Sequence, residues 1–233
     1  MQITGAQLFV KALKEEGVEV LFGYPGGQAI DLFDALYGET GIRLILPRHE
    51  QGLVHAADGY ARSTGRPGVC LVTSGPGAAN LVTGIATANY DSVPLVCFTG
   101  QVPTSLIGTD AFQEVDITGI TMPVTKHNYI VKDIRDLASI LREAFQIANS
   151  GRKGPVLVDI PKDITAQTCA YEKQPPLPLA ECGLPPQERL AQALELLNRA
   201  ERPFVYCGGG VVLSEASEAL APGVPVPTGK ATT

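Results

Sequence analysis

One carboxylate stands where an ionisable side chain could do chemistry. Glu50 follows the apolar run of residues 43–46 and lies in the segment PRHEQGLVHAADGYAR, where a predicted strand passes into a predicted helix. Ligands of parallel α/β sheets bind beyond the carboxyl ends of the strands. A carboxylate there can share a proton with a weakly basic group of a bound molecule. Glu50 is therefore a candidate for proton transfer, and the alternative is a residue that only caps or pairs at a helix start.

A glycine-rich turn occupies a similar position. The segment TSGPGAANLVTGIATA follows the apolar run 69–73 and opens a helix, so its glycines allow close backbone approach and its first amides can face a polar ligand. The spacing differs from the GxGxxG turn of dinucleotide sites, because Pro76 removes an amide and Asn80 replaces the packing residue. Taken alone, this turn could equally be structural.

The elements that would position these residues alternate along the chain. Short apolar runs bounded by Gly or Pro predict buried strands at residues 18–22, 43–46, 69–73, 93–98 and 155–160. Apolar residues at helical spacing predict helices over residues 4–16, 27–36, 50–64, 78–90 and 133–149. This alternation predicts right-handed crossover units and an α/β fold with a doubly wound parallel sheet.

The regular pattern stops near residue 165. We expect a first domain over residues 1–165, followed by a linker over residues 166–186 that its five prolines hold extended.

A second pattern begins after the linker. A helix is predicted over residues 187–198 and a strand over residues 203–207, followed by the glycines Gly208, Gly209 and Gly210. The last 13 residues hold too few apolar side chains to complete a sheet. We therefore expect residues 187–233 to be the incomplete start of a second α/β domain, in the front part of a longer protein.

Composition narrows the class of partner. The chain has 233 residues, a net charge of −6 and no run of Lys and Arg, which argues against nucleic acid or an anionic membrane surface as partner. No apolar stretch reaches the roughly 18 residues that a membrane span needs. These features favour a cytoplasmic protein that binds small molecules.

The five cysteines show no CxxC pair and no clustering with histidine, so we expect reduced thiols and no metal site built from them. Cys70, Cys97 and Cys207 lie in apolar runs and are expected to be small core residues.

Several motifs follow one another in a characteristic order. The chain carries LFGYPGG, PRHEQGLVHAADGYAR, GVCLVTSGPGAANLVTGIATA, DSVPLVCFTGQVP, GTDAFQEVDI, VTKHNY and SGRKGPVLVDIPKD. With these motifs it resembles the amino-terminal pyrimidine-binding domain of thiamine-diphosphate enzymes and, among them, the acetolactate (acetohydroxyacid) synthase family. The resemblance covers nearly all of residues 1–168 and, more faintly, residues 203–214.

The resemblance implies roles for particular residues. Glu50 would hydrogen-bond the aminopyrimidine ring of thiamine diphosphate and favour the tautomer that activates the cofactor, with Gly26 and Gln113 close to the reacting atoms. The other implied contacts of thiamine diphosphate are Tyr24, Pro25, Thr73, Pro76 and Asn80. Phe112 and Lys162 would face the substrate. The positions that match FAD contacts are Asp91, Arg152, Gly208, Gly209 and Gly210.

The resemblance also implies an activity. Members decarboxylate pyruvate and join the product to a second 2-ketoacid, which gives 2-acetolactate or 2-aceto-2-hydroxybutyrate for branched-chain amino acids. They bind Mg²⁺ through a diphosphate-binding region that has no match in these 233 residues. They form homodimers or larger homo-oligomers with the cofactor between two subunits, and a small regulatory subunit can join them. A fragment alone is expected to be inactive.

Other interpretations stay open. The same domain occurs in pyruvate oxidase, in sulfoacetaldehyde acetyltransferase and in catabolic acetolactate synthases without flavin. The motifs GTDAFQE and TKHNY favour the biosynthetic type. A non-catalytic binding module made of the pyrimidine domain is a further alternative, although an unfinished second domain argues against it.

Overall fold

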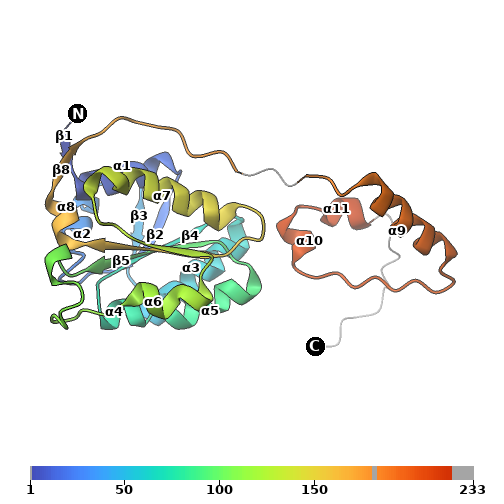
Figure 1. The fold of residues 1–233 in the computed structure, drawn as a ribbon, viewed down its shortest axis with the longest axis horizontal. Helices are drawn as coiled ribbons and strands as arrows, with labels where there is room; N and C mark the ends of the chain where they lie inside the picture. Colours follow the sequence, from blue (N-terminus) through green and yellow to red (C-terminus); the bar gives the residue numbers. More distant parts are fainter. Residues whose placement is uncertain (1, 180–182, 222–233) are drawn as a thin grey trace. The chain divides into compact units, whose positions relative to one another are not determined.

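A six-stranded parallel sheet runs through the centre of the first part of the molecule (Figure 1). In spatial order its strands are β3 (Arg43–Ile45), β2 (Val20–Tyr24), β4 (Gly68–Val72), β5 (Leu95–Gln101), β7 (Pro155–Pro161) and β6 (His127–Ile130). This computed structural model describes residues 2–179 and 183–221. The chain divides into two compact units, Met1–Glu181 and Cys182–Thr233, and each is described by itself.

The strand order reverses beside β2. The chain passes from β2 to β3 on one side and then returns to place β4 on the other side of β2, so that β2 is paired with both. In doubly wound sheets such a reversal leaves a crevice beyond the carboxyl ends of the two strands, and ligands bind there. The predicted α/β fold with a doubly wound parallel sheet is confirmed.

Helices cover both faces of the sheet (Figure 1). One face carries α1 (Gly5–Glu15), α2 (Ile30–Leu36), α7 (Ile134–Asn149) and α8 (Lys162–Ala166). The other face carries α3 (Glu50–Thr64), α4 (Pro76–Ala79), α5 (Val82–Asp91) and α6 (Ile117–Thr121). Short 3₁₀ turns lie at Thr104–Leu106 and Met122–Val124.

The central strands are buried on both sides because of this cover. Every residue of β5 and β7 is buried, and alternate residues feed the two cores. Cys97 and Leu157 belong to the core under α3 and α5, whereas Phe98 and Val158 belong to the core under α1 and α7. A polar residue in these strands therefore lies inside the protein and needs internal partners.

Local signals in the sequence set the helix ends. Thr4 and Gln7 form a capping box at the start of α1, and Asp133 accepts a hydrogen bond from the backbone of Arg135 at the start of α7. The predicted helix over 50–64 is confirmed to the residue, because His49 caps its start and Gly65, in the left-handed conformation, ends it.

Other elements differ from the predictions. The helix expected over 78–90 is two helices, α4 and α5, which Asn80 and Leu81 separate, and the helix expected from residue 27 begins at Ile30. Two further features were not predicted from the sequence: β6, and the small antiparallel pair of β1 (Gln2–Thr4) and β8 (Thr168–Ala170). These strands lie at an edge or outside the main sheet, and they lack the long apolar runs of buried strands.

The described part of the second unit, residues 183–221, contains α9 (Gln187–Arg199), α10 (Gly210–Leu213) and α11 (Ser217–Leu220). The strand predicted over 203–207 is wrong, because no described segment pairs with it and its aromatic side chains Phe204 and Tyr206 are almost fully exposed. Cys207 is exposed too, which corrects its expected place in a core. Residues 222–233, on which the expectation of an unfinished sheet rested, lie outside the described residues, as does Cys182.

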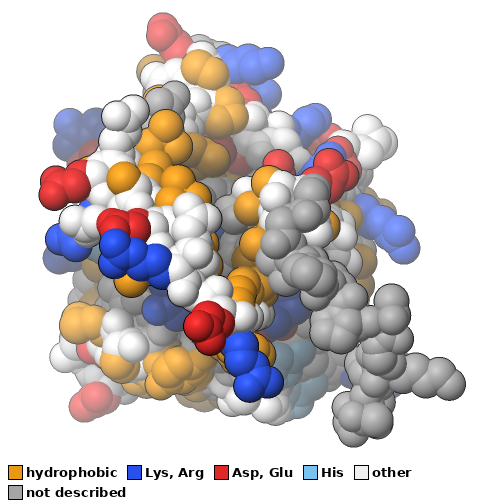
Figure 2. Space-filling model, turned by 90° about the vertical axis from the view of Figure 1, so that its right-hand side faces the viewer, with side chains coloured by type: hydrophobic (Ala, Val, Ile, Leu, Met, Phe, Trp, Pro, Cys, Tyr) orange, Lys and Arg blue, Asp and Glu red, His pale blue; other side chains and the backbone are white. Residues whose placement is uncertain are grey.

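Charged side chains of both signs occur on the face that Figure 2 shows. Figure 2 shows Lys, Arg, Asp and Glu side chains scattered over one face, with hydrophobic side chains between them. Among the described helices, none has the length and apolar character needed to cross a membrane.

Candidate functional site

The predicted cofactor residues gather where the strands end. Tyr24 is the last residue of β2 and Gly26 follows it, Thr73 follows β4 directly, and Lys162 follows β7. Glu50 is the first residue of α3, which begins after β3. The carboxyl ends of parallel strands share one edge of the sheet, so the fold brings these side chains to the crevice beside β2 and β4.

The turn after β2 packs tightly on the turn after β4. A Cβ atom on Gly26 would lie 2.6 Å from both Cβ and Cγ2 of Thr73, and one on Gly77 would lie 2.8 Å from that Cγ2. The backbone N–H of Gln28 donates to Thr73 Oγ1 at 3.2 Å. Thr73 therefore fixes the distance between the two turns, and only glycine fits on either side of it.

Glu50 is held by Asn80, which directly follows α4. Asn80 Nδ2 donates a hydrogen bond to Glu50 Oε2 at 3.0 Å. Within the described residues the other oxygen, Oε1, accepts no hydrogen bond, and a Cβ atom on Gly77 would lie 3.5 Å from it. Glu50 is half-buried at the amino-terminal end of α3, where the helix dipole favours a negative charge. One carboxylate oxygen is thus fixed and the other is available to a ligand.

The segment that carries Gln113 lies against the same turn. Gln113 has a positive φ of 60°, and a Cβ atom on Gly75, whose φ is 56°, would lie 2.6 Å from the Gln113 carbonyl oxygen. Phe112 is 84% exposed, so its ring is open to solvent in this chain. The backbones of Gly75 and Gln113 therefore touch, while Phe112 makes no core contact.

Internal hydrogen bonds fold this segment. The Glu114 carboxylate accepts the backbone N–H of Ala111 at 2.9 Å and also that of Gly108. These backbone hydrogen bonds lower the pKa of Glu114. At the other end of the segment, Asp163 accepts the Thr104 backbone N–H at 2.9 Å and the Thr104 hydroxyl at 2.6 Å.

Comparison with known protein families decides the family of this chain. Residues 3–120 match the family model described as "Thiamine pyrophosphate enzyme, N-terminal TPP binding domain". The chain belongs to this family. The predicted resemblance is thereby confirmed, and the crevice beside β2 and β4 lies within the matched residues.

Individual relatives are similar over nearly the whole chain. The acetolactate synthase large subunit of Mycobacterium tuberculosis is 51% identical over 97% of this chain and 38% of its own length. The isozyme 1 large subunit of Escherichia coli is 50% identical over 92% of this chain and 38% of its own. The chloroplastic acetolactate synthase of Arabidopsis thaliana is 51% identical over 90% of this chain and 32% of its own length. The chain thus spans about two fifths or less of these relatives.

The residues present suit the pyrimidine end of thiamine pyrophosphate. Glu50 offers a carboxylate oxygen with no internal partner among the described residues, beside two turns that pack closely on Thr73. Ser74 Oγ and Gln28 Oε1 are buried in the same turns, and neither has a hydrogen-bond partner in the part of the chain that the structure describes. In this thiamine pyrophosphate family member, Glu50 and Asn80 would hold the ring.

The Lys162 side chain reaches the turn after β2. Its Nζ donates to the Gly27 carbonyl at 3.0 Å, which joins the end of β7 to the turn after β2. The predicted substrate residues Lys162 and Phe112 both belong to segments at the carboxyl edge.

Sequence reasoning missed a buried polar group beneath the site. Asp159 in β7 is 1% exposed, and it accepts hydrogen bonds from the Thr99 hydroxyl at 2.6 Å and from Gln101 Nε2 at 2.9 Å. Burial raises the pKa of Asp159 to about 7, although those two hydrogen bonds lower it. The signal was present in the run VLVDIP, where one carboxylate interrupts a strand that is apolar on both faces.

The residues predicted to contact flavin have internal partners. Asp91, the last residue of α5, pairs with Arg62 at 2.7 Å. Arg152 donates to Ser92 Oγ at 2.8 Å and to the carbonyls of Asn89 and Tyr90 at 3.2 Å, so it caps the carboxyl end of α5. Gly208 and Gly209 precede α10 in the second unit, and Gly210 is its first residue.

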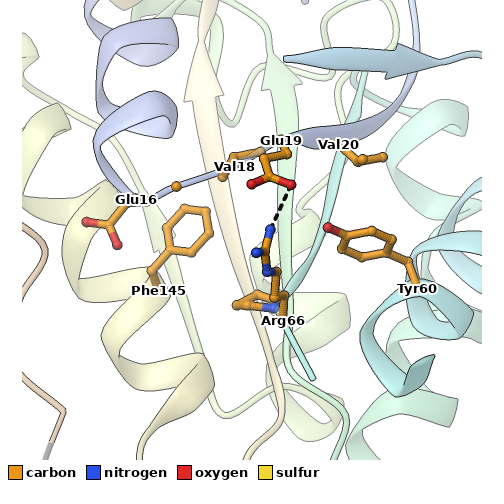
Figure 3. A pocket seen from close by; sticks show the side chains of 9 residues that line it. Glu16, Val18, Glu19, Val20, Tyr60, Arg66 and Phe145 are labelled. Carbon is orange, nitrogen blue, oxygen red and sulfur yellow. Dashed lines mark ion pairs between the residues drawn. The ribbon is translucent and has the colours of Figure 1, made fainter. Parts of the chain in front are cut away.

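A separate cavity of about 360 Å³ opens at the amino-terminal end of the sheet (Figure 3). Figure 3 shows Arg66 reaching Glu19 between Tyr60 and Phe145, and the ion pair measures 2.8 Å. Burial raises the pKa of Glu16 at its rim to about 7. None of the predicted cofactor residues lines this cavity.

Proposed function

We propose that the chain provides the cofactor-activating part of an acetolactate synthase, which joins pyruvate to a second 2-ketoacid. The observation that carries the proposal is the pairing of Glu50 with Asn80 beside two glycine turns, in a chain about half identical to acetolactate synthase large subunits. The products would be 2-acetolactate or 2-aceto-2-hydroxybutyrate, the precursors of valine, leucine and isoleucine.

When bound, thiamine diphosphate supplies a carbon that adds to the 2-ketoacid and an electron sink for the loss of carbon dioxide. Glu50 would hold a proton between its free Oε1 and a ring nitrogen of the cofactor, while Asn80 keeps Oε2 in place. The close contact of Gly26 with Thr73 would fix the turn after β2 beside the cofactor. Tyr24, Pro25, Thr73 and Pro76 would line the same ring.

The substrate would meet a different set of groups. Gln113 and Phe112 come from the segment packed on Gly75, and Lys162 comes from the end of β7. The exposure of Phe112 supports a role in contacting something outside this chain's own core.

The full proposal includes groups beyond this chain. Mg²⁺ would be bound by a diphosphate-binding region with no match here, and FAD by Asp91, Arg152, Gly208, Gly209 and Gly210. The name "large subunit" of several relatives supports a small regulatory partner, and we keep a homodimeric, cytoplasmic enzyme as part of the proposal. The first domain over 1–165, the linker over 166–186 and a FAD-binding-like domain from 187 also remain proposals.

The test uses the full-length natural protein with thiamine diphosphate, Mg²⁺ and FAD, in an assay for acetolactate. Glu50→Gln keeps the side chain's shape but removes its proton-sharing carboxylate, so we expect activity to fall by about 100-fold or more while the fold is kept. Glu39→Gln is the matched control, because the Glu39 carboxylate bonds Lys14 and the Gly41 backbone N–H in the loop before β3 and no predicted cofactor residue. Wild-type protein that makes no acetolactate would refute the proposal, and so would a Glu50→Gln variant as active as the control.

A further inference from the structure

A buried amide lies directly beneath the segment that carries Phe112 and Gln113. Gln101, the last residue of β5, is 3% exposed. Its Nε2 donates to Asp159 Oδ2 at 2.9 Å and to the carbonyl of Val115 at 3.0 Å, and its Oε1 accepts the Val102 backbone N–H at 2.9 Å. Both donors and the acceptor of the amide are therefore used, which fixes its orientation.

Asp159 holds Gln101 from the neighbouring strand. In the parallel register of β5 and β7, Asp159 lies opposite Thr99, whose hydroxyl donates to its Oδ1 at 2.6 Å. Thr99 and Gln101 are two residues apart on one strand, so they share the face that α6 covers, where Ile117 packs with Leu157. The Asp159 carboxylate thus accepts hydrogen bonds from two side chains. Thr99 helps to hold the carboxylate, and Gln101 also donates to the Val115 carbonyl.

The Val115 carbonyl links this pair to the site. It accepts from Gln101 Nε2 and also from the Ile117 backbone N–H at 2.8 Å, so it joins the sheet to the start of α6. Val115 is two residues from Gln113, whose backbone touches Gly75 at the start of α4. A shift of the Val115 carbonyl would move Gln113 relative to the turn that contains Thr73.

Stability alone gives no reason for this arrangement. A carboxylate and an amide are costly in a strand buried on both faces, and an apolar pair of the same shape would be about as stable. We infer that Gln101, oriented by Asp159, is a positioning residue that holds the segment of residues 102–116 so that Phe112 and Gln113 face the cofactor crevice. This inference rests on the proposed function for what the segment does, but not for how it is held.

Three variants of the full-length protein separate positioning from stability. Gln101→Met keeps the length of the side chain and removes all three of its hydrogen bonds. Thr99→Val is the matched control, because it removes a buried hydrogen bond to Asp159 but leaves Gln101 bonded to Val115. Asp159→Asn is the conservative variant, because its carbonyl oxygen can accept from Gln101 while its amide donates to Thr99.

Hydrogen–deuterium exchange of the protein without cofactor gives the first result. We expect exchange in peptides that cover residues 102–121 to rise about tenfold or more in Gln101→Met relative to Thr99→Val, and to stay near the wild-type rate in Asp159→Asn. The exchange rate of amides in α7 should be the same in the wild-type protein and in all three variants. Equal rates over residues 102–121 in Gln101→Met and Thr99→Val would overturn the inference, because the pair would then be purely structural.

Steady-state kinetics with cofactors give the second result. A misplaced Gln113 should lower kcat for acetolactate formation about tenfold or more in Gln101→Met, whereas Thr99→Val stays within about twofold of wild type. If Gln101→Met fails to fold, Gln101→Asn replaces it, since the shorter amide is drawn back from Val115. A wild-type protein without activity would refute the proposed function yet leave the exchange result to decide this inference.

Discussion

Two adjacent glycines after β2 have opposite surroundings. A Cβ atom on Gly26 would overlap Thr73, whereas one on Gly27 would have no atom within 4 Å. Neither position requires a positive φ, so the two differ in space and not in backbone strain. The difference makes them a matched pair for asking whether the close approach of the two turns matters.

Gly26→Ala should therefore force the turn after β2 away from Thr73. Overpacking of this kind costs about 1–3 kcal/mol, and a displaced turn should lower acetolactate formation by the full-length enzyme about tenfold or more. Gly27→Ala should stay within about twofold of wild type. Activity measured against thiamine diphosphate concentration checks both variants, and equal losses in the two would show that the contact with Thr73 is unimportant.

At this scale, sequence reasoning grouped residues that lie in turns after strands, and it missed partners that are distant in the chain. Glu50 and Asn80 were predicted at one site, and the structure joins them by a hydrogen bond although they are 30 residues apart. Asp159 and Gln101 are 58 residues apart in different strands, and no spacing rule links them. Their pairing depends on the register of β5 and β7, which the sequence pattern does not specify.

At the scale of elements, the carboxyl end of α5 is held by a cation. Arg152 comes from the loop before β7 and donates to two carbonyls of the last turn of α5, which otherwise has no basic residue there. The carboxyl end of a helix carries a partial negative charge and therefore favours a nearby cation. This role exists without any flavin, so Arg152 contributes to the fold whatever it binds in the complete protein.

Arg152→Ala should lower the free energy of unfolding by roughly 1 kcal/mol in flavin-free protein. Arg135→Ala is the control, because Arg135 is an exposed cation in the first turn of α7, where the helix dipole does not favour it. Removal of the Arg135 side chain should change the free energy of unfolding by less than about 0.5 kcal/mol. Urea unfolding of the 233-residue chain measures both, and indistinguishable midpoints would argue against the capping role.

The elements were predictable where local signals agree. The helix of residues 50–64 has a cap, a buried face that includes Leu53, Val54, Ala57 and Ala61, and a terminal glycine, and its bounds were predicted correctly. The strand over 203–207 rested on composition alone, and β propensity without a neighbouring strand forms no sheet. β6 was missed because its residues, HNYI, lack an apolar run although β7 pairs with it.

At the scale of the molecule, the two units differ in how they are stabilised. The first unit has two apolar cores on either side of its sheet. In the second unit, α9 has a Leu stripe at Leu190, Leu194 and Leu197, and each is between 45% and 60% exposed. Among the described residues of that unit, no side chain is buried. The stripe has the spacing of a helix that packs on another element.

The 233-residue chain should therefore show two kinds of amide in hydrogen–deuterium exchange. Amides of β4, β5 and β7 should be strongly protected, because they open only with the whole first unit. Amides of α9 should exchange nearly as fast as in a free peptide, since a 13-residue helix with no buried side chain is marginal in water. In the full-length protein α9 should become protected if its Leu stripe is covered there. Slow exchange of α9 in the 233-residue chain would contradict this picture, because the second unit would then be stable by itself.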